Sequence, residues 1–94
     1  MQKTAKYKIP GGKLVEVKVE CQAEIENVEI LGDFFIHPEE SIQKIEESLL
    51  GLDVKEDEET IANLIERVVT KNNIEMIGVT PEGIAHAIVM AVVK

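Results

Sequence analysis

Aromatic residues and cysteine are scarce in this 94-residue chain. Phe, Tyr and Trp together make up 3% of it, so the aromatic platforms on which single-stranded nucleic acids stack are nearly absent. The single cysteine, Cys21, excludes an internal disulfide and a thiolate zinc cluster, and such sparse use of cysteine is typical of a reducing compartment. Because Cys21 alternates with valines, we expect it to be a small core residue and not a nucleophile.

Long apolar runs and an excess of positive charge are missing as well. The longest apolar stretch, residues 84–93, is interrupted by His86 and is shorter than the ~20 residues that span a bilayer. The first eight residues lack the apolar segment of a secretory signal. Eighteen acidic against ten basic residues give a formal net charge of −8, which repels a phosphate backbone. We therefore expect a soluble, cytoplasmic protein that binds neither membranes nor nucleic acid.

The charge is divided unevenly along the chain. Residues 1–15 contain four lysines and no acidic residue. They carry +4, so the net charge of −8 leaves −12 for residues 16–94. A basic arm is thus predicted to precede an acidic body.

The length and the 45% content of hydrophobic residues indicate one domain over residues 1–94 with one core. Apolar and charged residues alternate over residues 5–9 and 15–21, which is the period of half-buried strands. The sequence Pro10-Gly11-Gly12 between them favours a chain reversal, and predicts a hairpin. A third strand should end near Gly32, with a bulge near Glu26-Asn27 where the two-residue period breaks. The sheet part then covers about residues 3–35.

Three amphipathic segments predict helices over about residues 38–93. The first lies between Pro38 and Gly51, with Glu39 and Glu40 in its first turn and His37 as its cap. The second follows the acidic run at residues 56–59 and ends at Asn72-Asn73.

The third predicted helix opens at Thr80-Pro81-Glu82 and continues through Val93. Both of its sides are apolar, so it is either central or covers another surface. Strands followed by helices predict an α+β fold, in which a three-stranded antiparallel sheet carries about three helices on one face.

The glycine turn and the histidines are the local features to weigh for chemistry. Gly11-Gly12-Lys13 does not have the spacing of a phosphate-binding loop. Turn chemistry explains its glycines, and Lys6 and Lys8 can pair with Glu16 or Glu20 across the hairpin. Neither His37 nor His86 has a Ser or Cys nucleophile near it in the sequence, so a catalytic relay is not predicted. The acidic runs lack a calcium-loop pattern and fit solvated helix faces. No catalytic or metal-binding residue is predicted.

Several segments together give the chain a family resemblance that covers residues 6 to about 88. The chain resembles the C-terminal accessory domain of lipoate-protein ligase, and this resemblance implies a fold similar to the sulfur-carrier scaffold of iron-sulfur assembly. The segments that carry it are Lys8-Ile9-Pro10-Gly11-Gly12-Lys13-Leu14-Val15, Gly32-Asp33-Phe34-Phe35, His37-Pro38-Glu39-Glu40, Leu49-Leu50-Gly51 and Gly78-Val79-Thr80-Pro81-Glu82.

The family's catalytic domain, with its Arg-Arg and Gly-Gly-Gly motifs, has no counterpart in these 94 residues. The resemblance therefore implies the small subunit of a split, two-chain ligase that is not catalytic alone. A separate large subunit is implied to bind lipoate, ATP and Mg²⁺, to form lipoyl-AMP and pyrophosphate, and to pass the lipoyl group to a lysine of an acceptor protein. This chain is implied to support the activation half and to bind no cofactor by itself.

Two groups of residues are candidates for contact with that large subunit. The candidates near the partner or its nucleotide are Lys8, Gly11, Gly12, Lys13, Gly32 and Asp33. The candidates for an apolar interface are Phe34, Phe35, Val89, Met90 and Val93.

Two other functions stay open on the sequence. One is a sulfur or iron-sulfur carrier, which needs Cys21 as an exposed thiol of low pKa. The other is a generic acidic adaptor that binds other proteins without a ligase partner.

Overall fold

The alternating segments of the first third form one antiparallel sheet. In the computed structural model, which describes residues 1–93, the strands are β1 (Gln2–Lys8), β2 (Leu14–Cys21) and β3 (Ile25–Gly32), in the order β1-β2-β3. The inward side chains of β2, including Val15, Val17 and Val19, are fully buried. The predicted hairpin and third strand are confirmed.

The break in the period of β3 is a bulge. Glu20 lies opposite Asn27, but its neighbour Cys21 lies opposite Ile25, so Glu26 is the additional residue. This insertion lets Ile25 and Val28 both face the core despite their odd spacing. The predicted bulge is confirmed.

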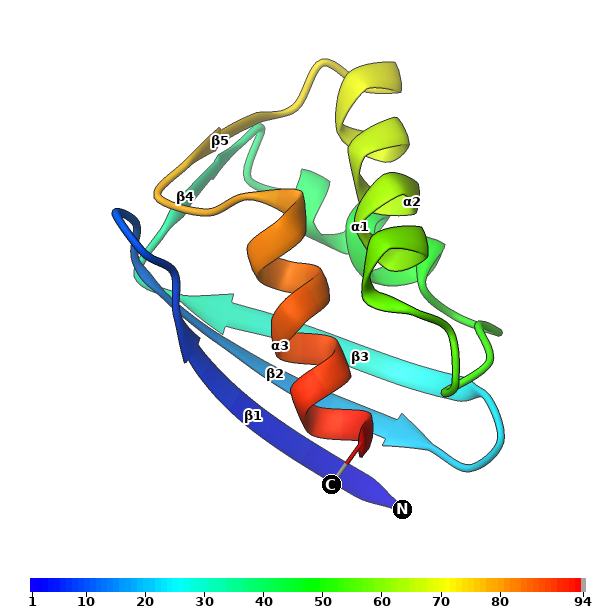
Figure 1. Ribbon diagram of the computed structural model, residues 1–94. Helices are drawn as coiled ribbons and strands as arrows, with labels where there is room; N and C mark the ends of the chain where they lie inside the picture. The colour runs from blue at the N-terminus through cyan, green and yellow to red at the C-terminus, as the bar shows by residue number, and fades with distance from the viewer. Residues whose placement is uncertain (94) are drawn as a thin grey trace.

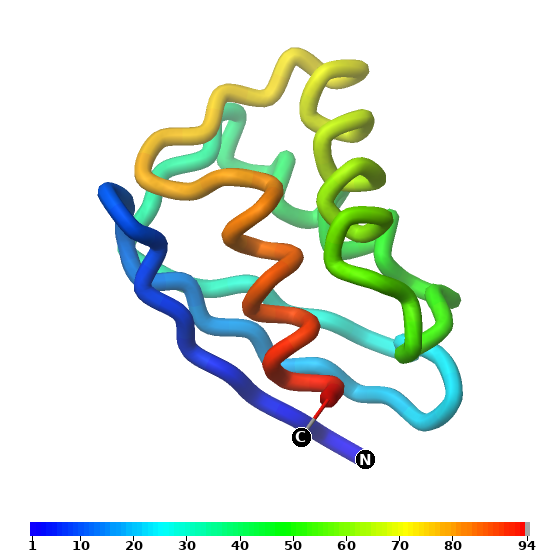
Figure 2. The backbone as a smooth tube through the Cα atoms, in the orientation of Figure 1, coloured from blue at the N-terminus to red at the C-terminus, as the bar shows by residue number. Residues whose placement is uncertain are grey.

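Three helices cover one face of this sheet (Figures 1 and 2). They are α1 (Ser41–Ser48), α2 (Glu58–Lys71) and α3 (Pro81–Val93). Helix α3 packs on β1 and β2, α1 packs on β3, and α2 packs on both other helices. The core lies between these layers, and the α+β architecture is as predicted.

Polar caps start the second and third helices. Helix α3 begins where the sequence predicted, whereas α2 begins at Glu58, inside the acidic run at residues 56–59 and not after it. The Asp57 carboxylate accepts a hydrogen bond from the Thr60 backbone N–H at 2.8 Å. Hydrogen bonding to Thr60, through its side chain first and its backbone N–H second, holds the pKa of Asp57 below its ordinary value. At the start of α3, the Thr80 hydroxyl accepts from the Gly83 backbone N–H at 2.9 Å. Both caps satisfy backbone donors that have no partner inside their helix.

The expected start of the first helix is wrong. Glu40 occupies the cap position without a side-chain cap, and the helix begins at Ser41, so Glu39 and Glu40 precede its first turn. The Ser41 backbone N–H bonds the Pro38 carbonyl at 2.9 Å, which makes residues 38–41 a tight turn that leads into α1. His37 is exposed, lies in a short strand opposite Glu75, and caps nothing.

A second, two-stranded sheet was not predicted. Strands β4 (Phe35–His37) and β5 (Glu75–Ile77) pair antiparallel. Along the sequence, β5 lies between α2 and α3. The helical part is therefore interrupted. Three residues are too few to display an alternating pattern, which explains why these strands escaped the sequence reasoning.

The outer edge of β3 is closed by α1 and the segment that follows it. The Ile30 N–H donates to a Glu46 carboxylate oxygen at 2.8 Å, and the Ile25 N–H donates to the Leu52 carbonyl at 2.8 Å. Burial raises the pKa of Glu46 above its ordinary value, although the bond from Ile30 acts in the opposite direction. At the other edge of the sheet, β1 carries three lysines, which discourage pairing with another chain.

Within residues 1–93, no helix combines the length and apolar character that crossing a membrane requires.

Candidate functional site

Three segments that carry the family resemblance meet at one end of the molecule. They are residues 10–13 in the β1–β2 turn, residues 32–35 at the end of β3 and the start of β4, and residues 78–80 before α3. Together they are called the loop edge here, and they lie at the left of the view in Figure 1. The Lys13 backbone N–H bonds the Gly78 carbonyl at 2.8 Å, and the Asp33 N–H bonds the Leu14 carbonyl at 3.3 Å. The loop edge is therefore held together by backbone contacts.

Glycine is required where the turn meets the loop before α3. Gly78 has φ +85°, and a Cβ there would lie 2.6 Å from the Lys13 Cγ. A Cβ on Gly12 would lie 2.8 Å from the Gly78 carbonyl oxygen. Two backbones thus approach at a distance that side chains would prevent.

Lys8 and Lys13 have different roles in this turn. The Lys8 ammonium donates to the Gly12 carbonyl at 2.7 Å and to the Ile9 carbonyl at 3.3 Å, so it closes the turn. The exposed Lys13 packs its Cγ against Gly78. Within residues 1–93 its ammonium makes no hydrogen bond or ion pair. Of the two lysines, Lys13 is therefore the one whose ammonium is available to bind a group of another molecule.

The cross-hairpin ion pairs considered from the sequence do not form within the described chain. Lys8 lies opposite Leu14 and not opposite an acidic residue. Lys6 lies opposite Glu16 in register, but the two salt bridges found among residues 1–93 involve other groups.

The remaining turn and strand-end candidates also lie on the loop edge. Gly11 is exposed at the tip of the turn with φ +74°. Gly32 lies directly under the ring of Phe34, and Asp33 is exposed beside it.

The five apolar interface candidates lie in three different environments. Phe34 is partly buried against the core, whereas Phe35 is 74% exposed and lies opposite Ile77 in the β4–β5 pair. Val89 and Met90 pack partly against the core. Val93 is 75% exposed at the far end of α3 from the loop edge. Of these candidates, only Phe34 and Phe35 therefore belong to the loop edge.

The side chains with reactive groups have structural partners. The His86 Nδ1 lies 2.9 Å from a Glu58 carboxylate oxygen, and its ring centroid lies 4.3 Å from that of Tyr7. His86 thus links α3 to α2 and β1. Cys21 is only 4% exposed, so the exposed thiol that a carrier function needs is contradicted. No cluster of His, Cys, Asp and Glu within residues 1–93 is arranged to hold a metal ion.

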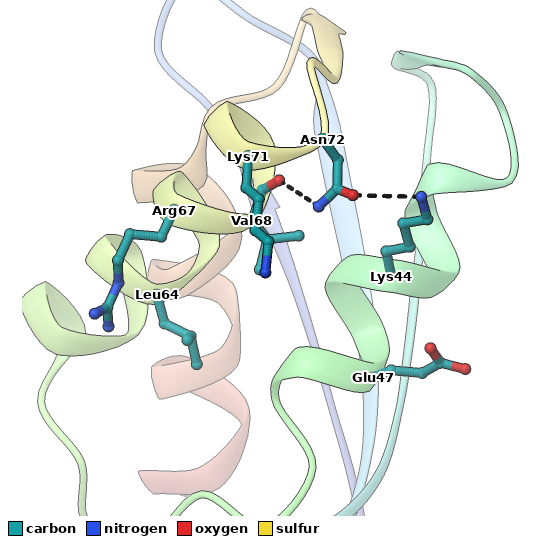
Figure 3. Close-up of a pocket in the computed structure, with 7 residues that line it drawn as sticks. All are labelled: Lys44, Glu47, Leu64, Arg67, Val68, Lys71 and Asn72. Carbon is teal, nitrogen blue, oxygen red and sulfur yellow. Dashed lines mark hydrogen bonds between the residues drawn. The ribbon is translucent and has the colours of Figure 1, made fainter.

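A hollow of about 290 Å³ between α1 and α2 is bordered by three cationic side chains, Lys44, Arg67 and Lys71. Lys44 donates to the Asn72 side-chain oxygen at 3.4 Å. Figure 3 shows Arg67 pointing toward the far side of α2, away from Lys44. The cations do not converge on one point, so this hollow is not built to hold an anion.

Comparisons with known proteins agree with the resemblance. The family described as bacterial lipoate protein ligase C-terminus matches residues 1–88. One similar structure is a chain from an archaeal lipoylation system of Thermoplasma acidophilum, described as a bi-partite lipoate protein ligase and its E2 lipoyl domain. It is 28% identical with a TM-score of 0.75, and the match covers 94% of each chain. No match is found among curated protein sequences. Because the family covers nearly the whole of it, the chain belongs to the family of bacterial lipoate protein ligase C-terminal domains.

Proposed function

We propose that this chain is the accessory subunit of a two-chain lipoate-protein ligase. It acts with a separate large subunit that binds lipoate, ATP and Mg²⁺ and carries out the chemistry. In the activation half, the lipoate carboxylate attacks the α-phosphorus of ATP, which gives lipoyl-AMP and releases pyrophosphate. In the transfer half, an acceptor lysine attacks the lipoyl carbonyl and AMP leaves. A cytoplasmic location is part of the proposal, since the lone Cys21 thiol is unpaired.

The observation that carries this proposal is the loop edge itself. Three of the five segments by which the chain resembles the ligase family converge there, although they are far apart in the sequence. The described residues place no nucleophile beside a base and no metal cluster there. An edge that is rigid, exposed and without reactive groups is suited to contact another molecule and not to break bonds. The bi-partite ligase from Thermoplasma acidophilum, similar over 94% of both chains, supports a partner of the ligase type.

Lys13 is the residue that we expect to contribute most to the activation half. Its ammonium has no internal partner within residues 1–93, and its base is fixed against Gly78. A unit charge 4 Å from an anionic oxygen gains ~4 kcal/mol at intermediate dielectric before desolvation is subtracted. A net gain of about 1–2 kcal/mol for departing pyrophosphate corresponds to roughly 5- to 30-fold in rate.

The test separates activation from transfer. We expect Lys13→Ala to lower the rate of lipoyl-AMP formation by roughly 5- to 30-fold and to leave transfer from preformed lipoyl-AMP unchanged. Lys18→Ala is the matched control, because Lys18 lies on β2, which follows the turn that carries Lys13, but in the middle of the sheet, opposite Thr4 and Glu29. Pyrophosphate release and lipoylation of the acceptor are the two readouts. Equal pyrophosphate release by Lys13→Ala and Lys18→Ala, with subunit binding intact, would remove Lys13 from the activation step.

A further inference from the structure

Phe35 of the loop edge and Ile77, which directly precedes its third segment, form an apolar pair that the domain does not use for its own core. Phe35 is 74% exposed and Ile77 is 56% exposed, and they lie directly opposite each other across β4 and β5. Directly opposed side chains of an antiparallel pair point to the same face. Phe35 and Ile77 thus form one apolar surface, called the Phe35–Ile77 pair here.

This pair is held rigidly by the residues between and beside it. On the opposite face of the same two strands, Ile36 is buried in the core and Met76 packs partly against it. Phe34 next to Phe35 is fixed by its contact with Gly32. Docking would therefore not require a flexible segment to become ordered. An exposed aromatic side chain contributes most to binding when no such ordering is needed.

The surroundings of the pair indicate what covers it. Ile77 is followed directly by Gly78, against which the unpartnered Lys13 packs, so Lys13 borders the residue next to the apolar pair. Leu14 and Leu31 are further partly exposed apolar side chains, at the end of the sheet that adjoins the loop edge. A second copy is a poor occupant, because each chain carries a net charge of −8 and the two would repel. A different chain with an apolar hollow beside an anionic group fits better.

We propose that the Phe35–Ile77 pair is the apolar anchor by which this chain docks on the large ligase subunit, with Lys13 beside it facing an anionic group of that subunit or of its nucleotide. This inference rests on the proposed function and adds its contact surface. It predicts that the large subunit contacts the loop edge and not the exposed end of α3 at Val93.

The experiment compares surface variants of the 94-residue chain for binding to the large ligase subunit from the same organism. The test variant is Phe35→Ser with Ile77→Ser, and the matched control is Leu50→Ser, an exposed leucine outside the loop edge. Biolayer interferometry gives Kd, and thermal unfolding verifies that each variant is folded. We expect Kd to rise at least about 30-fold for the test variant, as for loss of a central anchor, and less than about twofold for Leu50→Ser. Lipoyl-AMP formation should be lost at low concentrations of the variant and recovered at high ones.

Other outcomes would overturn the inference in distinguishable ways. An unchanged Kd for the folded test variant, or an equal loss with Val93→Ser or Leu50→Ser, rejects this surface but leaves the accessory function standing. Failure of the wild-type chain to bind the large subunit rejects both proposals. A wild-type dimer in sedimentation velocity that Phe35→Ser dissociates would assign the pair to a second copy of this chain.

Discussion

Two glycines with nearly the same positive φ but different surroundings allow a direct test of the loop edge. Gly51 and Gly78 have φ values of +86° and +85°. A Cβ on Gly51 would meet nothing within 4 Å, whereas one on Gly78 would lie 2.6 Å from the Lys13 Cγ. The left-handed φ penalises alanine to a similar extent at both positions, so the difference between the two losses of stability reports mainly the contact with Lys13.

The expected losses of stability follow from these two terms. A left-handed conformation costs a non-glycine residue roughly 1–2 kcal/mol, which is the whole effect expected of Gly51→Ala. Gly78→Ala must also push Lys13 off its rotamer, which adds about 0.5–1.5 kcal/mol. We therefore expect a loss of roughly 1.5–3.5 kcal/mol for Gly78→Ala.

Equilibrium urea unfolding measures both losses, since a domain of this size is expected to unfold in two states. In a Lys13→Ala background the Cγ is gone, so the additional loss at position 78 should vanish while the loss at position 51 persists. Equal losses for Gly51→Ala and Gly78→Ala in the wild-type background would refute the packing of Lys13 on Gly78, and with it the rigid placement of that lysine.

Two further predictions concern carboxylates. Because burial raises the pKa of Glu46, the folded state binds its proton more tightly than the unfolded state. Stability should therefore fall as the pH rises from the ordinary glutamate range through the raised pKa. Glu46→Gln can still accept from the Ile30 N–H, so it should lack this fall and be at least as stable as wild type at neutral pH. Urea unfolding between about pH 4 and pH 7 measures the pH dependence of stability. The same pH dependence in the variant as in wild type would contradict the prediction. The pKa of Asp57 is lowered, so its contribution to stability is present above the ordinary aspartate range and is lost as the pH falls through the lowered value. Asp57→Ala should lower the melting temperature at neutral pH. Asp57→Asn should lower it less, because its amide oxygen still accepts from Thr60. The difference in melting temperature between wild type and Asp57→Ala should disappear in acid. A gap that is the same at both pH values would argue against the charged cap.

Local patterns were enough to predict the main elements. The alternation through Val15, Val17 and Val19 identified the central strand, and Thr80-Pro81 identified the start of α3. These features act within a few residues of themselves, so the sequence displays them directly. The buried state of Cys21 followed from the same alternation.

Features that depend on distant pairing could not be predicted in this way. Phe35 and Ile77 are more than forty residues apart and meet only because β4 pairs with β5. Neighbouring residues of a strand face opposite sides, so which of Phe34 and Phe35 is exposed depends on a register that the sequence does not display. Likewise, the folded turn decides that Lys8 binds carbonyl groups while Lys13 is left without a partner.

The central claim is that this chain acts by binding another protein that performs the chemistry. The most direct measurement adds increasing amounts of the chain to a fixed amount of the large ligase subunit with lipoate, ATP and Mg²⁺, and follows pyrophosphate release. We expect release to rise with the amount added and to saturate at one chain per large subunit, with none from this chain alone. Release that does not respond to the chain, or turnover by the chain without a partner, would contradict the account.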